Sequence, residues 1–345
     1  MFQKKLKEVK WMPLTVREIA QAAGVSPATV SRYFSGSNVV STEVARKIES
    51  VVDEYGYKPK SKKFKDNGVI AVLLPDLQLG FYSEMIKLLI DEIPKYNYRI
   101  VFIPIIEGSE GYKLFFKEMN IVGVIFLDEA MDKDIFNYIS SKNVKRVMCA
   151  GATLADKTQM VHINDMAAAY EGTKYLISLG HEKIIFLSDF IKNIGSSFQR
   201  YAGCKRALEE IGISLNDNEM LGLGKVTYES GYRLTKQFLE KKTEFTAIFA
   251  FSDEMAIGAI SALSDFGLKV PEDVSVLGFD DISLASRVVP RLTTVHQPLK
   301  EFVVKTLEMF QVLDNSNDIV ELTLPYKLII RETCSENRGV KIYEK

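Results

Sequence analysis

Cysteine is scarce in this sequence. Among 345 residues there are three, Cys149, Cys204 and Cys334, and they lie too far apart for the short spacings of a metal site. Cys149 and Cys204 stand in apolar segments, where a free thiol behaves as a small core residue. An odd number of cysteines without a secretory signal indicates the reducing cytoplasm. We therefore expect free thiols and a cytoplasmic protein.

Histidine is equally rare, and the common catalytic motifs are missing. The three histidines, His162, His181 and His296, do not cluster in sequence with a nucleophile, and His181 is expected to pack the strand that follows it. No GxSxG elbow, phosphate-binding P-loop or metal-binding HExxH is present. We predict no enzyme activity, no cofactor and no metal site. A sugar-processing enzyme stays open as an alternative, because carboxylates stand at predicted strand ends.

Long apolar runs are missing too, so the sequence predicts a soluble protein without a membrane span. Hydrophobic residues nevertheless make up 47% of the chain, which is enough for a large core. The length suggests two or three domains. Residues 1–13 are a basic N-terminal extension without the apolar centre of a secretory signal. They are either an arm that touches DNA or a leader before a start at Met12.

The small net charge of the chain conceals an uneven distribution of charge between its first part and the rest. The formal net charge is −1, but residues 1–66 hold 13 Lys/Arg against 7 Asp/Glu, and residues 67–345 hold 31 against 38. A basic first part on an acidic body is typical of a protein whose first part alone meets phosphates. A solvated face is the simpler alternative.

The sequence after residue 13 predicts two short helices joined by a tight turn. Thr15 and Glu18 form a capping-box pattern at the start of the first helix. Gly24 supplies the turn, because a positive φ costs little only for glycine. Ser26 caps the second helix, and Pro27 occupies its first position, where the missing N–H costs nothing.

A third helix completes this domain. After Ser41 the residues Val44, Ile48, Val51 and Tyr55 recur at helical spacing. Three helices with a short polar second helix form the helix-turn-helix arrangement, whose second helix fits the major groove of DNA. We predict this domain over residues 14–58, with an ordinary three-helix interaction module as the alternative.

The second helix is predicted to read bases. Val30 points inward, while Arg32 can bond a guanine and Pro27, Ala28 or Thr29 can touch a thymine methyl. The residues predicted to contact DNA from this domain are Thr15, Ser26, Pro27, Ala28, Thr29, Ser31 and Arg32.

Eight different short motifs are distributed along nearly the whole chain. They are Thr15-Val-Arg-Glu-Ile-Ala20, Ser26-Pro-Ala-Thr-Val-Ser-Arg32, Tyr57-Lys-Pro59, Gly180-His-Glu-Lys183, Arg200-Tyr-Ala-Gly203, Ser252-Asp-Glu-Met-Ala-Ile-Gly258, Val270-Pro-Glu-Asp-Val-Ser-Val-Leu-Gly-Phe-Asp-Asp281 and Leu292-Thr-Thr-Val-His-Gln-Pro298. In this order they resemble the lactose/galactose repressor family of bacterial transcription regulators. The resemblance favours DNA binding over the interaction module.

Residues 59–68 form a basic linker. The resemblance implies that this region becomes a hinge helix on DNA, where the family inserts a leucine into the minor groove. Here the linker is shorter and holds no leucine, which makes Phe64 the candidate wedge. The alternative is a tether in which Lys62 and Lys63 neutralise phosphates without any wedge.

From residue 69 onward, continuous apolar strand-like runs alternate with helical patterns, which predicts parallel sheets covered on both faces. The predicted fold is a small all-α helix-turn-helix head plus an α/β body of two Rossmann-like lobes, similar to periplasmic binding proteins. The resemblance implies three chain crossings between the lobes. The N-terminal lobe then spans residues 69–162 and 296–323, and the C-terminal lobe spans residues 163–295 and 324–340.

Polar residues gather at predicted strand ends, where open α/β sheets bind ligands. Carboxylates and one arginine can bracket neighbouring hydroxyls, and an aromatic ring can cover the apolar face of a sugar. By resemblance, Arg200, Asp280 and the pair Ser252-Asp253 are where the family holds its effector. Turn and helix caps are the structural alternatives for Asp280 and Asp253. The predicted effector-binding residues are Phe81, Tyr82, Arg200, Ser252, Asp253 and Asp280.

These features together predict a dimeric, sugar-responsive transcription regulator that represses carbohydrate-utilisation genes. Its predicted partners are near-palindromic double-stranded DNA, a small sugar effector and a second copy of the chain, without a membrane. Some relatives use a phosphoprotein corepressor, which no residue here indicates. The alternative is a sugar-binding protein or sugar-processing enzyme without a DNA role.

Overall fold

The computed structural model describes residues 15–34, 40–55, 67–74, 80–104, 111–127, 133–142, 144–151, 158–189, 195–312 and 319–339. The chain divides into two compact units, Met1–Asp66 and Asn67–Lys345. The predicted N-terminal extension and the linker residues Lys62, Lys63 and Phe64 lie outside the described residues.

The first unit is a bundle of three helices, α1 (Val16–Ala22), α2 (Pro27–Phe34) and α3 (Thr42–Tyr55). The predicted capping box is confirmed: Thr15 N donates to Glu18 Oε2 at 2.6 Å, and Glu18 N donates to Thr15 Oγ1 at 3.4 Å. Gly24 has φ +66°, as the predicted turn requires. The buried centre of the bundle consists of Ile19, Ala20, Ala23, Val30, Ile48 and Val51.

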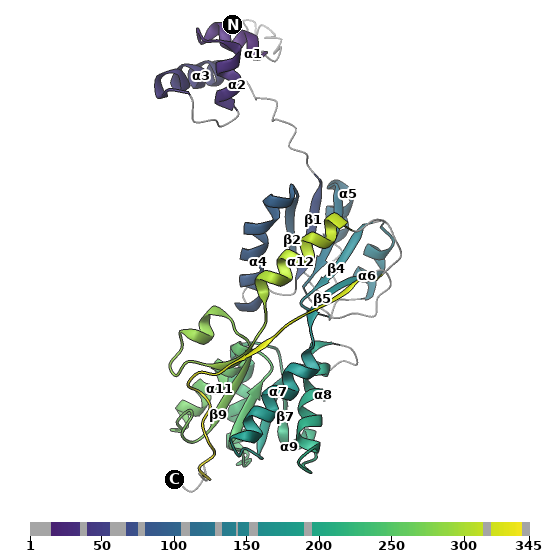
Figure 1. Cartoon of the computed structure of the whole chain (residues 1–345), viewed down its shortest axis with the longest axis vertical. Coiled ribbons are helices and arrows are strands. Elements are labelled where there is room, and N and C mark those ends of the chain that lie inside the picture. Colours follow the sequence, from purple (N-terminus) through teal and green to yellow (C-terminus); the bar gives the residue numbers. More distant parts are fainter. Residues whose placement is uncertain are drawn as a thin grey trace, which may run out of the picture. The chain divides into compact units, whose positions relative to one another are not determined.

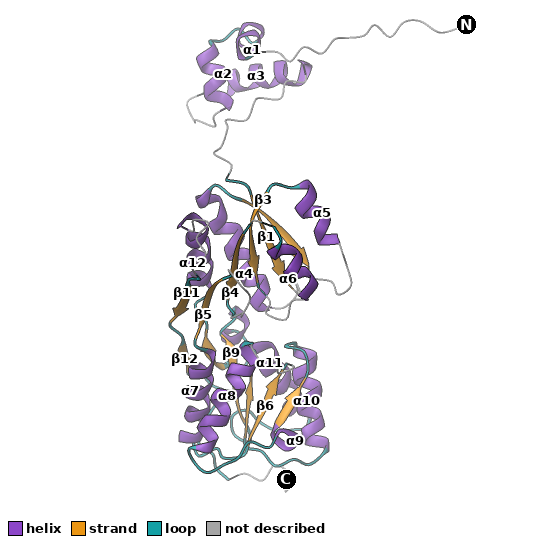
Figure 2. Cartoon of the chain, turned by 90° about the vertical axis from the view of Figure 1, so that its right-hand side faces the viewer, coloured by secondary structure: helices purple, strands orange, loops and turns teal. Residues whose placement is uncertain are grey.

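The second unit contains two six-stranded sheets (Figures 1 and 2). The first sheet has the order β11-β5-β4-β3-β1-β2, and all its pairs are parallel. Its strands are β1 (Val69–Leu74), β2 (Arg99–Pro104), β3 (Ile121–Phe126), β4 (Lys145–Cys149), β5 (Gln159–Ile163) and β11 (Glu321–Leu324).

The second sheet has the order β12-β10-β9-β8-β6-β7, and only β12 runs antiparallel to its neighbour. Its strands are β6 (Ile184–Ser188), β7 (Leu221–Leu223), β8 (Ala247–Ala250), β9 (Ser275–Asp280), β10 (Thr293–His296) and β12 (Lys327–Ile329). Every residue of β6, β8 and β9 is buried, because helices cover both faces of the sheet.

Helices complete the two lobes. In the first lobe, α4 (Gly80–Glu92), η1 (Ile93–Tyr96) and α12 (Leu299–Val312) cover one face of the sheet, and α5 (Gly111–Glu118) and α6 (Lys133–Ser140) cover the other. In the second lobe, α7 (Asp165–Ser178) and α8 (Ser196–Glu209) lie on one face, and α10 (Tyr228–Glu240) and α11 (Asp253–Asp265) lie on the other. The short α9 (Asp217–Met220) precedes β7, and η2 (Ser283–Ser286) follows β9.

The chain crosses between the lobes three times. It passes from β5 to α7 at Asn164, from β10 to α12 at residues 297–298, and from β11 to β12 at residues 325–326. Figure 1 shows the last crossing as the yellow segment that runs along both lobes. This two-lobed α/β body with a helix-turn-helix head is the fold that the sequence predicts.

None of the described helices combines the length and the apolar character that crossing a membrane requires.

Candidate functional site

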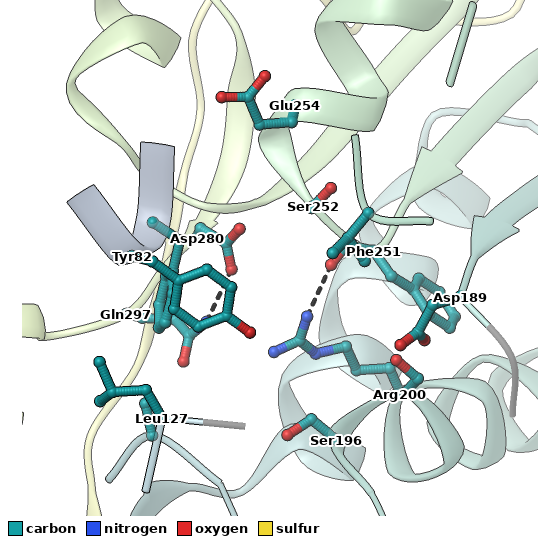
Figure 3. A pocket seen from close by; sticks show the side chains of 14 residues that line it. Tyr82, Leu127, Asp189, Ser196, Arg200, Phe251, Ser252, Glu254, Asp280 and Gln297 are labelled. Carbon is teal, nitrogen blue, oxygen red and sulfur yellow. Dashed lines mark hydrogen bonds between the residues drawn. The ribbon is translucent and has the colours of Figure 1, made fainter. Parts of the chain in front are cut away.

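A cavity of about 120 Å³ lies between the two lobes (Figure 3). Its residues follow the carboxyl ends of strands in both sheets, because Leu127 comes after β3, Asp189 after β6 and Ser252 after β8. Open α/β sheets bind ligands at this edge. The lining residues are Phe81, Tyr82, Leu127, Ala150, Asp189, Ser196, Ser197, Arg200, Val226, Phe251, Ser252, Glu254, Asp280 and Gln297.

Arg200 is the cation of this lining, and it is held rigidly. Its Nε donates to Asp165 Oδ1 at 2.7 Å, and its Nη1 donates to the carbonyl oxygen of Phe251 at 2.6 Å. The centre of the guanidinium lies 3.6 Å from the centroid of the Phe279 ring. The residue is only 8% exposed, so stacking and charge-assisted hydrogen bonds fix its orientation before a ligand arrives.

Gly203 explains why Arg200 reaches Asp165. A Cβ on Gly203 would lie 2.1 Å from the carbonyl oxygen of Met166, so only glycine allows α8 to approach α7 this closely. Asp165 stands in the first turn of α7, and Asn164 caps that helix by accepting from Ala167 N at 2.9 Å. The order Asn164-Asp165 thus places a carboxylate against the guanidinium.

Asp280 lies at the end of β9 with an unusual backbone. Its φ is +121°, a region that residues with a side chain rarely adopt, and such strain often marks a functional site. Gln297 Nε2 donates to Asp280 Oδ1 at 2.8 Å. Burial raises the pKa of Asp280 to about 7, an effect that the nearby Arg200 charge and the Gln297 hydrogen bond only partly offset.

Asp281 turns away from the cavity. It also has a positive φ, +59°, and its carboxylate contacts Arg331 Nη2 at 2.6 Å and His296 Nδ1 at 2.9 Å. His296 ends β10, directly before the crossing into α12. The Asp280-Asp281 pair therefore connects the cavity with one of the crossings between the lobes.

Ser252 and Asp253 occupy different environments. Ser252 lines the cavity and caps α11, since its Oγ accepts from Met255 N at 3.2 Å. Asp253 is fully buried and does not line the cavity. It accepts hydrogen bonds from Ile282 N at 2.9 Å and from Thr294 Oγ1 at 2.5 Å, which fixes the loop after β9. The effector contact predicted for Asp253 does not agree with this position.

Phe81 and Tyr82 bring the first lobe to the cavity. They stand at the start of α4, and their rings pack edge to face with centroids 5.4 Å apart. Both rings line the cavity opposite the second-lobe residues, so an apolar surface and a polar surface meet there. Five of the six predicted effector-binding residues thus border the same cavity.

Sequence reasoning missed several lining residues. Asp189 follows a strand directly and could have been selected by the same signal as Asp280. Glu254 belongs to the Ser252–Gly258 motif, but its direction along the helix could not be assigned from sequence. Gln297 reaches the cavity only because β10 lies beside β9, which no local pattern reveals.

Two hydrogen bonds near the cavity join the first lobe to the second. Glu254 Oε1 of the second lobe accepts from Gly80 N of the first at 3.2 Å. In the reverse direction, Glu84 Oε1 of α4 accepts from Ser283 N at 2.6 Å. We call these two bonds the interlobe bridge.

The second helix of the head presents its predicted surface to solvent. Pro27, Ala28, Ser31 and Arg32 are exposed, whereas Val30 is fully buried. The side chains of Ser26 and Thr29 are engaged with each other at 2.8 Å, and Ser26 Oγ also accepts from Thr29 N. Thr15 serves the capping box. The exposed residues of α2 thus face solvent, while the caps set the ends of the helices.

A second hollow lies at the opposite edge of the second sheet. It is lined by residues 182–185, Ile213, Glu219, Met220, Thr243 and Glu244, near the amino end of β6. Ligands of open α/β sheets bind at the carboxyl edge instead, so we assign the site to the cavity between the lobes.

Two family models and a curated relative match this chain. The family model for bacterial regulatory proteins of the lacI family matches residues 15–60, and that for a periplasmic binding protein-like domain matches residues 173–334. The HTH-type transcriptional regulator RegA of Clostridium saccharobutylicum is 32% identical over 331 residues, covering 93% of this chain and 99% of RegA.

Two solved structures extend the comparison. A LacI family transcriptional regulator from Enterococcus faecium with bound ribose is 25% identical, with a TM-score of 0.69, covering 78% of this chain and 100% of that one. The lac repressor dimer bound to operator and an anti-inducer is 23% identical with a TM-score of 0.69, covering 94% of this chain and 100% of that one, and therefore shares the fold.

Proposed function

The chain belongs to the lacI family of bacterial regulatory proteins, and we propose that it is a repressor whose affinity for its operator is controlled by a small sugar bound between the lobes. The observation that carries the effector part is the composition of the cavity. A fixed guanidinium, several carboxylates and hydroxyls, and two aromatic rings surround one small space. This is the set of groups that recognises a polyhydroxylated ring. The ribose held by the Enterococcus faecium relative supports the assignment.

The proposed control acts through the angle between the lobes. Phe81 and Tyr82 come from the first lobe, and Arg200 and Asp280 from the second, so a ligand in the cavity contacts both. A ligand that fits one angle better than another shifts the population toward it. In a dimer this changes the spacing of the two heads, and with it the fit to two operator half-sites.

The head and linker carry the DNA part of the proposal. Residues 14–58 read the major groove through the exposed face of α2, and residues 59–68 join them to the body. We infer a cytoplasmic location, because a repressor acts where its operator is.

The proposal is tested by Arg200→Ala and Asp280→Asn. Removing one member of a buried hydrogen-bonded set costs about 1–3 kcal/mol, which lowers sugar affinity by about five- to 150-fold. Both variants should still bind a selected operator and should no longer respond to the sugar that acts on the wild type. Operator binding is measured at fixed salt with and without sugar, and sugar affinity is measured by calorimetry.

An exposed change on α4, Asp91→Ala, is the control, and it should keep the response. Unchanged sugar affinity in both cavity variants would remove these residues from the site. Turnover of the sugar by the wild type would instead support the enzyme alternative.

A further inference from the structure

The lining of the cavity contains more acidic than basic side chains. The lining contains three carboxylates, those of Asp189, Glu254 and Asp280, and one guanidinium, that of Arg200. Arg200 is already paired with Asp165, which lies behind the lining, at 2.7 Å. Because the pKa of Asp280 is raised to about 7, the excess negative charge around the cavity near neutral pH comes mainly from Asp189 and Glu254.

Two of the three carboxylates already have hydrogen-bond donors. Asp280 accepts from Gln297, and Glu254 accepts from the backbone N–H of Gly80. Asp189 differs from both. Asp189 as a whole is partly exposed, but its Oδ1 is buried and has no hydrogen-bond partner among the residues that the structure describes.

Asp189 borders the cavity, which places its unpaired oxygen near the proposed ligand. The residue directly follows β6 and borders the same cavity as Arg200, as Figure 3 shows. A carboxylate oxygen that has left water without gaining a donor is costly, and native structures rarely keep one without a reason. A donor on the ligand removes that cost.

We propose that the effector is an amino sugar or a similar polyhydroxylated amine, with its ammonium group against Asp189. An ammonium supplies a charge-assisted hydrogen bond, about twice as strong as one from a neutral hydroxyl, and it offsets the excess negative charge. A phosphorylated or acidic sugar would face the carboxylates of Asp189 and Glu254 in a partly buried site, where repulsion is weakly screened. This inference rests on the proposed function and adds the charge class of the ligand.

Matched sugar pairs test the proposal on the full-length protein. Calorimetry compares glucosamine with glucose, galactosamine with galactose, and mannosamine with mannose, and glucose 6-phosphate serves as the anionic probe. In each pair that binds, the amine should bind at least about tenfold tighter, as expected for a charge-assisted bond. Glucose 6-phosphate should not bind.

The variant Asp189→Asn keeps the shape and removes the charge. It should reduce the ratio of amine to hydroxyl affinity to within about threefold, because an amide retains only a neutral hydrogen bond. The control Asp91→Asn removes the same charge from an exposed position on α4 and should preserve the ratio. The wild-type ratios decide the question even if Asp189→Asn fails to fold.

The outcomes separate this inference from the proposed function. A neutral sugar that binds as tightly as its amine, or tighter, overturns the amine assignment and leaves sugar control intact. The tightest binding by glucose 6-phosphate overturns the charge argument. No binding by any of the seven compounds counts against both proposals.

Discussion

At the scale of single residues, burial changes what a carboxylate does. Asp253 and Asp280 are both nearly inaccessible, at 0% and 6% exposure, and burial raises the pKa of each. Asp253 uses both oxygens for internal donors, so it fixes the loop after β9. Asp280 borders the cavity and adopts a strained backbone. The same residue type therefore supports the fold at one position and borders the cavity at the other.

The raised pKa of Asp280 predicts a pH dependence of stability. Its pKa is about 7 in the folded body, against about 3.9 in an unfolded chain. The contribution of this group is full below the unfolded pKa and is lost as pH rises through the folded pKa. Between about pH 5 and pH 8, the wild type should lose on the order of 2 kcal/mol of unfolding free energy relative to Asp280→Asn.

Thermal unfolding of the ligand-free protein, followed by circular dichroism across this range, measures the difference. Groups that do not interact with Asp280 titrate equally in both proteins, so the comparison isolates Asp280 together with its effect on Asp253. Parallel pH profiles for wild type and variant would contradict the buried, proton-retaining state of Asp280.

At the scale of elements, short caps and close helix contacts position the functional side chains. The head holds α2 outward because Val30 packs inward while its neighbours face solvent. In the body, α8 carries Arg200 to Asp165 because Gly203 permits close contact with α7. The orientation of α2 thus depends on the buried Val30, and the position of Arg200 depends on Gly203.

The exposed face of α2 predicts base reading by Arg32. Arg32→Ala should weaken binding to the selected operator by about 1–3 kcal/mol and relax the base preference at one position per half-site. Titrations at fixed salt with specific and nonspecific duplexes measure the effect. Arg46→Ala on α3 removes the same charge and should lower both affinities by a similar factor. Equal operator affinity of wild type and Arg32→Ala would sink the assignment.

At the scale of the whole body, two sheets are joined by three crossings and by the interlobe bridge of Glu254 to Gly80 and Glu84 to Ser283. Glu254 also borders the cavity, so one residue belongs to both the bridge and the cavity lining. Because only three crossing segments connect the lobes, the angle between the lobes can change without unfolding either of them.

The bridge predicts that a residue outside the cavity affects ligand affinity. Glu84→Ala removes the bond to Ser283, which should cost about 0.5–1.5 kcal/mol and lower sugar affinity roughly two- to tenfold. Calorimetry on wild type, Glu84→Ala and the same-helix control Asp91→Ala measures this. If Glu84→Ala binds the sugar as the control does, the bridge plays no part in holding the lobes around a ligand.

Local patterns in the sequence determined much of this protein. The capping box at Thr15, the turn at Gly24 and the position of Pro27 depend on neighbours within four residues, so the head could be predicted. The buried strands β1 and β9 were also predictable, because continuous apolar runs are typical of a sheet covered on both faces. Neither the short β7 nor the helix α10 was identified from the sequence. Three residues are too few for β7 to show a period, whereas α10 was missed although Thr227 caps it and its apolar residues Leu234 and Phe238 recur at helical spacing.

The site was only partly determined by sequence. Arg200 and Asp280 stand in motifs that could be recognised, but Asp253 stands in one too and is directed into the body instead of the cavity. Gln297 reaches the cavity because β10 lies beside β9, and Glu254 reaches it because of the way α11 packs on the sheet. The open oxygen of Asp189 is likewise a property of its surroundings. Burial and the direction of a side chain depend on contacts between distant segments, and only the tertiary structure decides those.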